Sequence, residues 1–371
     1  MVFVAYLFPF LTCLVLKIWW DYEGDWADYA AIVVVGEVVV GLFHLTVKKI
    51  YISDTEFLGS YVENLFHEEP WTEIIHYTET RTDSRGKTYT VPKVRYVYHP
   101  DCYYFDTSIG SRIVTDADFY RYVRKVWNVG RQPLSWWSPH IRGGGRFGSK
   151  FSYSHVSTDD RTSMAKLIPI TETHKYTNKI RRSNSIFKFE KISRAKAAEL
   201  GLYDYPRVEW HDAECILSAR HTVDRHVRHN FRKLNAVLGA IGQIRIHILI
   251  FDSVQGVGIS EYQRAYWEGG NKNEFTVCIG LDDNDKVEWA RCFSWADSPE
   301  LDVAAAAWLM DNPNLDWEAF GSWLQSNLYK WKRKEFKDFD YIVVNLPLPQ
   351  ILTVYALSIL ENALAVYIAI H

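Results

Sequence analysis

Residues 29–47 read YAAIVVVGEVVVGLFHLTV, and within this run only Glu37 and His44 carry side chains that are charged near neutral pH. An apolar run of this length is close to the roughly 20 residues that a helix needs to cross a membrane. Two further runs have the same character, at 2–20 (VFVAYLFPFLTCLVLKIWW) and 351–370 (ILTVYALSILENALAVYIAI). We therefore predict three transmembrane helices, two N-terminal and one C-terminal. The alternative is that these runs are buried core helices.

The charges beside these runs predict one orientation in a membrane. The loop at 21–28 (DYEGDWAD) has acidic residues and no Lys or Arg, whereas Lys48 and Lys49 follow the second run and five basic residues lie within 330–337. Cytoplasmic loops carry an excess of Lys and Arg. The N-terminus and residues 48–345 are therefore predicted to be cytoplasmic and the C-terminus external. The first run lacks a basic start and a cleavage site, so a retained span is expected.

Polar side chains inside the apolar runs are the first candidate site. Glu37 and Glu361 lie near the middle of their runs, where an ionisable group is costly and is usually paired or functional. Two interpretations stay open: hydrogen bonds that hold the helices together, or a path for protons or ions in an oligomer. The candidate intramembrane residues are Glu37, His44, Glu361 and Asn362.

The region at 48–130 mixes helix and strand patterns. Asp54 is predicted to cap a helix over TEFLGSYVENLF, and Asp116 a second one. Residues 72–81 and 88–99 are predicted to form a β-hairpin, which brings His99 beside Trp71. A metal site at that end, suited to a membrane-tethered metal-dependent hydrolase, is weighed against a merely polar sheet end. Its candidate ligands are His67, Glu69, His99, Asp101 and Cys102.

Residues 131–191 are basic and rich in aromatic side chains, with twelve basic and four acidic residues. This mixture suits single-stranded nucleic acid or anionic lipid headgroups. The alternative is a solvated face neutralised by the acidic remainder of the chain. A helix predicted over about 212–240 adds further cations. The candidate anion-binding residues are Arg142, Arg146, Lys150, Arg181, Arg182, Arg225, Arg228 and Arg232.

The glycine-rich stretch at 142–153, RGGGRFGSKFSY, is not predicted to bind a nucleotide. A phosphate-binding loop places Lys directly after its second glycine, between a buried strand and a helix. Here Ser149 precedes Lys150, and Pro139 interrupts the preceding segment. No helical period follows either. The sequence therefore predicts a surface loop and no cofactor.

Residues 192–346 are predicted to form an α/β region. Ser193 caps a short helix, 244–252 reads as a buried strand, 260–267 as a helix, and DDND at 282–285 as the turn of a second hairpin. Over about 215–295 this element order resembles that of a TPM domain, an α/β module of membrane-tethered proteins. The chain also resembles uncharacterised phage and bacterial membrane proteins. No TPM ligand residue is matched, so the resemblance implies a fold and no activity.

Composition adds little about partners. The chain has 371 residues, a net charge of −3 and five scattered cysteines, which do not resemble a disulfide framework. We predict an α+β cytoplasmic region between transmembrane helices, divided at 1–47, 48–130, 131–191, 192–346 and 347–371. The predicted function is a non-enzymatic membrane scaffold or binding module that contacts anionic lipid, nucleic acid or an acidic partner. A homo-oligomeric pore or transport component is the alternative.

Overall fold

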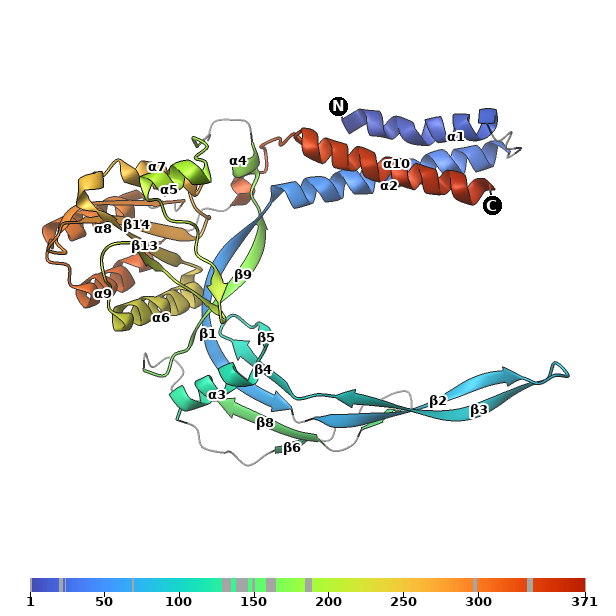
Figure 1. The fold of residues 1–371 in the computed structure, drawn as a ribbon, viewed down its shortest axis with the longest axis horizontal. Helices are drawn as coiled ribbons and strands as arrows, with labels where there is room; N and C mark the ends of the chain where they lie inside the picture. The colour runs from blue at the N-terminus through green and yellow to red at the C-terminus, as the bar shows by residue number, and fades with distance from the viewer. Residues whose placement is uncertain are drawn as a thin grey trace. The chain divides into compact units, whose positions relative to one another are not determined.

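A computed structural model describes residues 2–19, 23, 25–68, 70–128, 135–137, 146–148, 151–157, 165–183, 189–295, 299–331 and 336–370 (Figure 1). The chain divides into two compact units. The first comprises Met1–Glu56, His174–Ile192 and Lys334–His371, and the second comprises Phe57–Thr173 and Ser193–Arg333. Both units are built from segments that are distant in the sequence.

The first unit is dominated by apolar helices. A 3-10 turn, η1 (Val2–Leu7), leads into α1 (Phe8–Trp19), which is followed by α2 (Trp26–Ile52) and, at the other end of the chain, α10 (Leu348–Ile370). Asp25 caps α2 in a reciprocal box with Asp28. By length and composition α2 and α10 are able to cross a membrane, whereas Phe3–Trp19 is a shorter apolar helix. The predicted apolar helices near both ends of a mixed α+β chain are thus confirmed.

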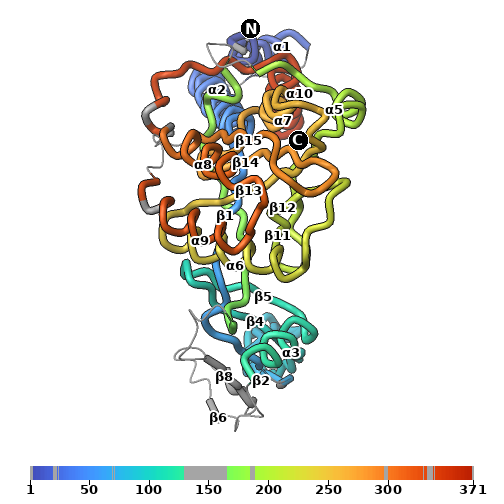
Figure 2. Tube along the Cα trace, turned by 90° about the vertical axis from the view of Figure 1, so that its left-hand side faces the viewer, coloured from blue at the N-terminus to red at the C-terminus, as the bar shows by residue number. Residues whose placement is uncertain are grey.

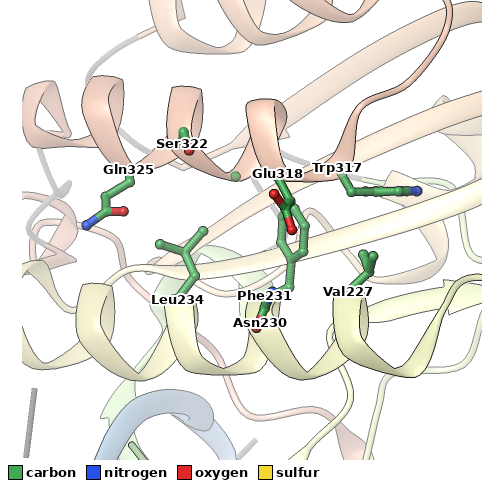
Figure 3. Close-up of a pocket in the computed structure, with 9 residues that line it drawn as sticks. Val227, Asn230, Phe231, Leu234, Trp317, Glu318, Ser322 and Gln325 are labelled. Atoms are coloured by element: carbon green, nitrogen blue, oxygen red, sulfur yellow. The ribbon is translucent and has the colours of Figure 1, made fainter. Parts of the chain in front are cut away.

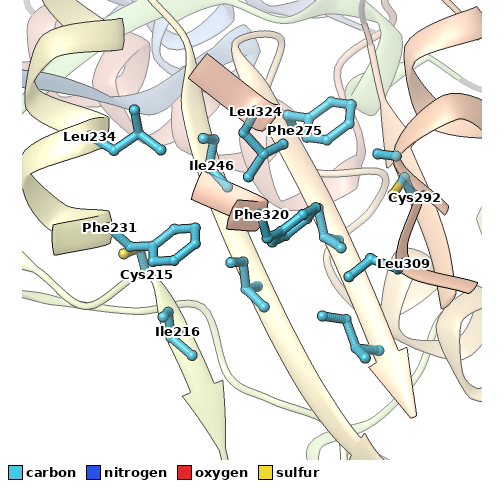
Figure 4. Close-up of a cluster of buried hydrophobic side chains, with 14 of the residues drawn as sticks. Cys215, Ile216, Phe231, Leu234, Ile246, Phe275, Cys292, Leu309, Phe320 and Leu324 are labelled. Atoms are coloured by element: carbon cyan, nitrogen blue, oxygen red, sulfur yellow. The ribbon is translucent and has the colours of Figure 1, made fainter. Parts of the chain in front are cut away.

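The second unit contains a four-stranded sheet with the order β12-β13-β14-β15. Its strands are β12 (Ile216–Ser218), β13 (Arg245–Asp252), β14 (Glu274–Leu281) and β15 (Val287–Ser294), and the last pair is antiparallel (Figure 2). One face of the sheet packs on α6 (Arg225–Gly242), α8 (Pro299–Asp311) and α9 (Trp317–Asn327) around Ile246, Phe275 and Phe320 (Figure 4). The other face packs on α7 (Ile259–Tyr266) and the segment after α5 (Arg194–Leu200).

A second sheet in this unit gathers strands from 53 to 177. Its order is β5-β4-β1-β8-β6, and β9 (Pro169–Thr177) also pairs with β1 (Ser53–Glu68). The other members are β4 (Cys102–Thr107), β5 (Arg112–Thr115), β6 (Ser135–Trp137) and β8 (Phe151–Ser157). The helix α3 (Ala117–Val126), capped by Asp116 as predicted, buries Phe119 and Val123 against it. A two-stranded sheet, β10 (Val208–Glu209) with β11 (Asp212–Ala213), lies beside α6 in the sequence.

The predicted hairpin is confirmed with its register. β2 (Trp71–Thr82) pairs with β3 (Thr88–His99) from Trp71 opposite His99 to Thr82 opposite Thr88. The free side of β2 pairs with β7 (Arg146–Gly148). The hairpin at β14 and β15, the strand at β13 and the helix at α7 are also confirmed.

Three predicted elements are wrong. Residues 54–66 form no helix but the long strand β1, because pairing with β4 and β8 overrides the local helical pattern. The helix predicted over 212–240 begins only at Arg225, since 212–218 contributes to two sheets. The stretch 341–347 forms no strand, and it leads into α10 without regular structure. Of the glycine loop, only 146–148 lies within the described residues.

Candidate functional site in the apolar helix bundle

Three apolar helices of the first unit pack side by side (Figure 1). Their contact buries Ala5, Val40, Val47 and Val354, while Tyr51 and Tyr355 pack at the edge. At Gly36 the chain of α2 touches Pro9 of α1, because a Cβ on this glycine would lie 2.7 Å from the Pro9 ring. The close approach of small residues is typical of helices that associate in a membrane.

Asn362 is the centre of the polar interior of this bundle. Its side chain is 8% exposed, and its Oδ1 accepts a hydrogen bond from Thr12 Oγ1 of α1 at 2.5 Å. Its Nδ2 donates to the Ser358 carbonyl oxygen and to Glu361 Oε2, each at 2.7 Å. The predicted residues Glu361 and Asn362 are therefore neighbours in one network that joins α10 to α1. Sequence reasoning missed Thr12, which alone supplies the contact between the helices.

Glu37 and His44 do not bond to each other. His44 Nδ1 lies 3.2 Å from the Tyr6 hydroxyl, and the two rings meet edge to face. The Glu37 carboxyl is half-buried, and within the described residues nothing forms a hydrogen bond with it. The four predicted intramembrane residues thus fall into two bonded groups and one carboxyl without a partner in the described part of the chain.

A polar cluster closes one end of α2. Asp54 Oδ2 accepts from Arg181 Nη1 at 2.6 Å and from Asn178 Nδ2 at 3.0 Å. Asn178 in turn caps α4 (Lys179–Arg182), whose Arg182 Nε donates to the Tyr51 carbonyl oxygen at 3.1 Å. Asp54 therefore joins α2 to α4 in place of its predicted role as a helix cap. This cluster ties together segments that lie more than a hundred residues apart in the sequence.

The other predicted anion-binding residues are divided between several places. In the second unit Arg228 Nη1 lies 3.4 Å from Glu214 Oε2, and Arg232 Nη1 lies 3.6 Å from Asp212 Oδ2. Arg225 is exposed and has no ion pair among the described residues. Arg142, Lys150 and the side chain of Arg146 lie outside the described residues. Several predicted cations are thus engaged with carboxylates of the same chain.

The predicted metal ligands form two separate pairs. His67 Nε2 lies 2.9 Å from Asp101 Oδ1, and His99 Nε2 lies 3.1 Å from Glu73 Oε2. His67 belongs to the six-stranded sheet and His99 to the three-stranded one. No group of three potential ligands gathers among the described residues, and Glu69 lies outside them. Burial raises the pKa of the Cys102 thiol, which favours its neutral form.

The hairpin β2–β3 presents a surface that sequence reasoning did not single out. Tyr96 and Tyr98 project from one face and are 69% and 66% exposed. Arg85, Lys87 and Arg95 are exposed and have no ion pair among the described residues. Exposed aromatic rings and cations on one ribbon are typical of binding surfaces.

A groove of about 290 Å³ runs between α6 and α9 in the second unit (Figure 3). Phe231 and Leu234 form its floor, and the Phe231 ring meets that of Trp317 edge to face at 5.9 Å. Asn230, Glu318, Ser322 and Gln325 line its rim. Its volume is at the lower limit of small-molecule pockets.

The second unit also contains a buried polar cluster at the start of β13 and β14. Arg245 is 1% exposed and donates to Thr171 Oγ1 at 2.9 Å and to the Ala213 carbonyl oxygen at 2.8 Å. Burial alone raises the pKa of Glu274, but contacts with His247, Tyr205 and the Asn271 backbone outweigh it and lower this pKa to about 2. Because burial lowers the pKa of His247, its ring is neutral beside an ionised Glu274.

Comparisons with known proteins identify no relative. No protein-family model matches the chain, and neither a curated protein nor a solved structure matches it.

Proposed function

We propose that this chain is a membrane-anchored scaffold, held by α1, α2 and α10. The supporting observation is the apolar surface of α2 and α10, of which only 11% and 22% of the apolar windows are buried. A core helix of a soluble protein would be mostly buried. Ten side chains on the outward faces are each between 53% and 67% exposed, namely Val34, Val35, Val38, Leu42, Leu45, Leu352, Ile359, Leu360, Leu364 and Ile368.

The energy of this surface favours lipid as its surroundings. Burying one such side chain is worth about 1.5–3 kcal/mol, so leaving ten of them more than half exposed to water forgoes on the order of 10 kcal/mol. That is comparable to the whole stability of a typical domain. Lipid tails remove the cost, because they are as apolar as the side chains themselves.

The charges at the two ends of α2 support the predicted orientation. Glu23, Asp25 and Asp28 lie at its N-terminal end, and Lys48 and Lys49 at its C-terminal end. Arg182 is bonded to Tyr51 at that second end as well. We propose that the basic end faces the cytoplasm, where anionic headgroups attract each Lys or Arg near the surface by about 1 kcal/mol.

The hydrogen bonds inside the bundle favour a packing role over transport. Glu361 is engaged by Asn362, which is itself held by Thr12 and the backbone of α10. A carboxyl fixed by a saturated amide suits adhesion between helices. The hydrolase alternative has less support, because the described candidate ligands lie in two separate pairs. The contact partner proposed for the scaffold is anionic lipid, and the exposed β2–β3 hairpin is the surface available to a nucleic acid or an acidic protein.

Cysteine labelling tests the anchor and its orientation. In a Cys13→Ser, Cys102→Ser background, Glu23→Cys and Arg85→Cys place matched exposed thiols in the loop before α2 and at the hairpin tip. An impermeant reagent should label Glu23→Cys in intact cells and Arg85→Cys only after lysis. The reverse pattern would overturn the orientation, and release of the protein from membranes by alkaline carbonate would overturn the anchor.

A further inference from the structure

We propose that two copies of this chain associate in the membrane through one side of α2, with the Glu37 carboxyls of the two copies hydrogen-bonded to each other. This inference rests on the membrane anchor proposed above. It begins from Glu37, which lies near the middle of α2 and is half-buried. No hydrogen bond to it arises from the parts of the chain that the structure describes.

The position of Glu37 on the helix explains why its own bundle does not satisfy it. Gly36, Val40 and Val47 form the buried face of α2. Each residue turns about 100° around the helix axis, so Glu37 lies at the border between this buried face and the outward one. A carboxyl at that border is within reach of a helix that approaches from outside the bundle.

The residues around Glu37 allow such an approach. Ala30, Val34 and Gly41 lie on the same side of α2, at spacings of seven, three and four residues from Glu37. Val34 is 62% exposed, and a Cβ on Gly41 would find one neighbour, the Tyr6 hydroxyl, at 3.9 Å. Small residues along one side of a membrane helix permit close contact between helix backbones.

The chemistry of the carboxyl points to a second copy as the occupant. An ionised carboxylate is costly in hydrocarbon, so Glu37 is stable there in its protonated form. A protonated carboxyl carries one donor and acceptor oxygens, and it is therefore complementary to itself. In a twofold dimer the same residue meets itself across the axis, so one half-buried Glu37 in each chain satisfies the other without a second kind of partner.

Disulfide trapping in native membranes tests the proposed face. In the Cys13→Ser, Cys102→Ser background, Val34→Cys and Gly41→Cys should form a covalent dimer under mild oxidation. Val35→Cys and Leu42→Cys are matched controls, since each lies one residue further along the helix and is 59% or 57% exposed in the native residue. Equal trapping at the control positions, or a product that contains a different protein, would overturn the proposal.

Variants of Glu37 test the hydrogen bond itself. Glu37→Gln retains a donor and an acceptor and should dimerise as the parent does, whereas Glu37→Leu should dimerise about tenfold more weakly, as measured by energy transfer on dilution in lipid. Equal dimerisation of the Leu variant would overturn the role of Glu37. If the chain resists carbonate extraction but is trapped at none of the four positions, the dimer is wrong and the anchor stands. If carbonate releases the chain, the anchor is wrong, and the dimer falls with it.

Discussion

Replacing Gly59 by alanine should destabilise the second compact unit, because β1 and α6 touch there backbone to backbone. A Cβ on Gly59 would lie 2.0 Å from the Asn235 carbonyl oxygen, and a Cβ on Gly239 would lie 2.3 Å from the Gly59 carbonyl oxygen. Ordinary contact begins at 3.4 Å. The strand and the helix would therefore have to separate by about 1.4 Å to admit one methyl group.

Neither element is free to make that movement. The Asn235 side chain donates to the Ile246 carbonyl oxygen at 3.0 Å and accepts from the Ile246 backbone N–H at 2.6 Å, which fixes α6 on β13. Asn273 Nδ2 donates to the Phe57 carbonyl oxygen at 2.6 Å, which fixes β1 beside β14. Overpacking of a rigid contact costs about 1–3 kcal/mol and sometimes more. We expect about 3 kcal/mol for Gly59→Ala.

Gly239→Ala should cost less than Gly59→Ala. Alanine is favoured over glycine by about 1 kcal/mol inside a helix, and that gain offsets part of the overpacking at this position in α6. We therefore expect a net loss of about 2 kcal/mol. The ordering of the two variants tests whether the contact, and not the glycine content, sets the stability.

Thermal unfolding followed by tryptophan fluorescence measures these losses. At about 2–4 °C per kcal/mol for a unit of this size, Gly59→Ala should lower the midpoint by about 6–12 °C. Gly258→Ala is the matched control, because its φ is −59° and nothing lies within 4 Å of the added Cβ. That variant should stay within about 0.5 kcal/mol of the parent. A Gly59→Ala midpoint equal to that of Gly258→Ala would refute the reasoning.

Two further predictions concern the helix bundle and the acid stability of the chain. Thr12→Val keeps the shape of the side chain but removes the donor to Asn362, and it should destabilise the bundle by about 0.6–1.7 kcal/mol in detergent unfolding; Thr12→Ser retains the hydroxyl and is the control, and equal stability of both variants would contradict the role of this bond. Burial, followed by the charges of Lys233, Arg232 and His226, lowers the pKa of His229 to about 4. Because the unfolded chain binds a proton at His229 below pH 6.5 and the folded chain does not, stability should fall as the pH falls from about 6.5 to 4, by at most about 1.4 kcal/mol per pH unit from this residue. His229→Gln should flatten that fall in urea titrations at each pH, and an unchanged slope would contradict the shift.

Local patterns predict the elements whose partners are near in sequence. The β2–β3 hairpin and its register follow from two strand-forming runs around a short polar loop. The helix α3 follows from the Asp116 cap and the spacing of its apolar residues. The apolar helices follow from length and composition alone. In each of these cases the interactions that decide the structure lie within about thirty residues.

Elements decided by distant partners could not be read in the same way. β1 lies between β4 and β8, which are about forty and ninety residues further along the chain, and nothing in TEFLGSYVENLF identifies those partners. The same limit explains the cations. Arg228 and Arg232 appear on the sequence as a free basic face, but β11 and the residue after it bring Asp212 and Glu214 to them. Thr12 as the partner of Asn362 is separated from it by the whole chain.

The buried polar cluster of the second unit has the position of a structural junction. Arg245 and Glu274 stand at the first residues of β13 and β14, which are parallel and in register there. Ligands of open α/β sheets bind at the opposite edge, outside the carboxyl ends of the strands. At the amino ends, Arg245 instead bonds to Thr171 of β9, and its guanidinium lies 5.8 Å from the Phe57 ring of β1. These charges therefore join the two sheets of the unit. Because removing one member of such a group leaves the others buried and unpaired, the cluster fixes how the sheets meet.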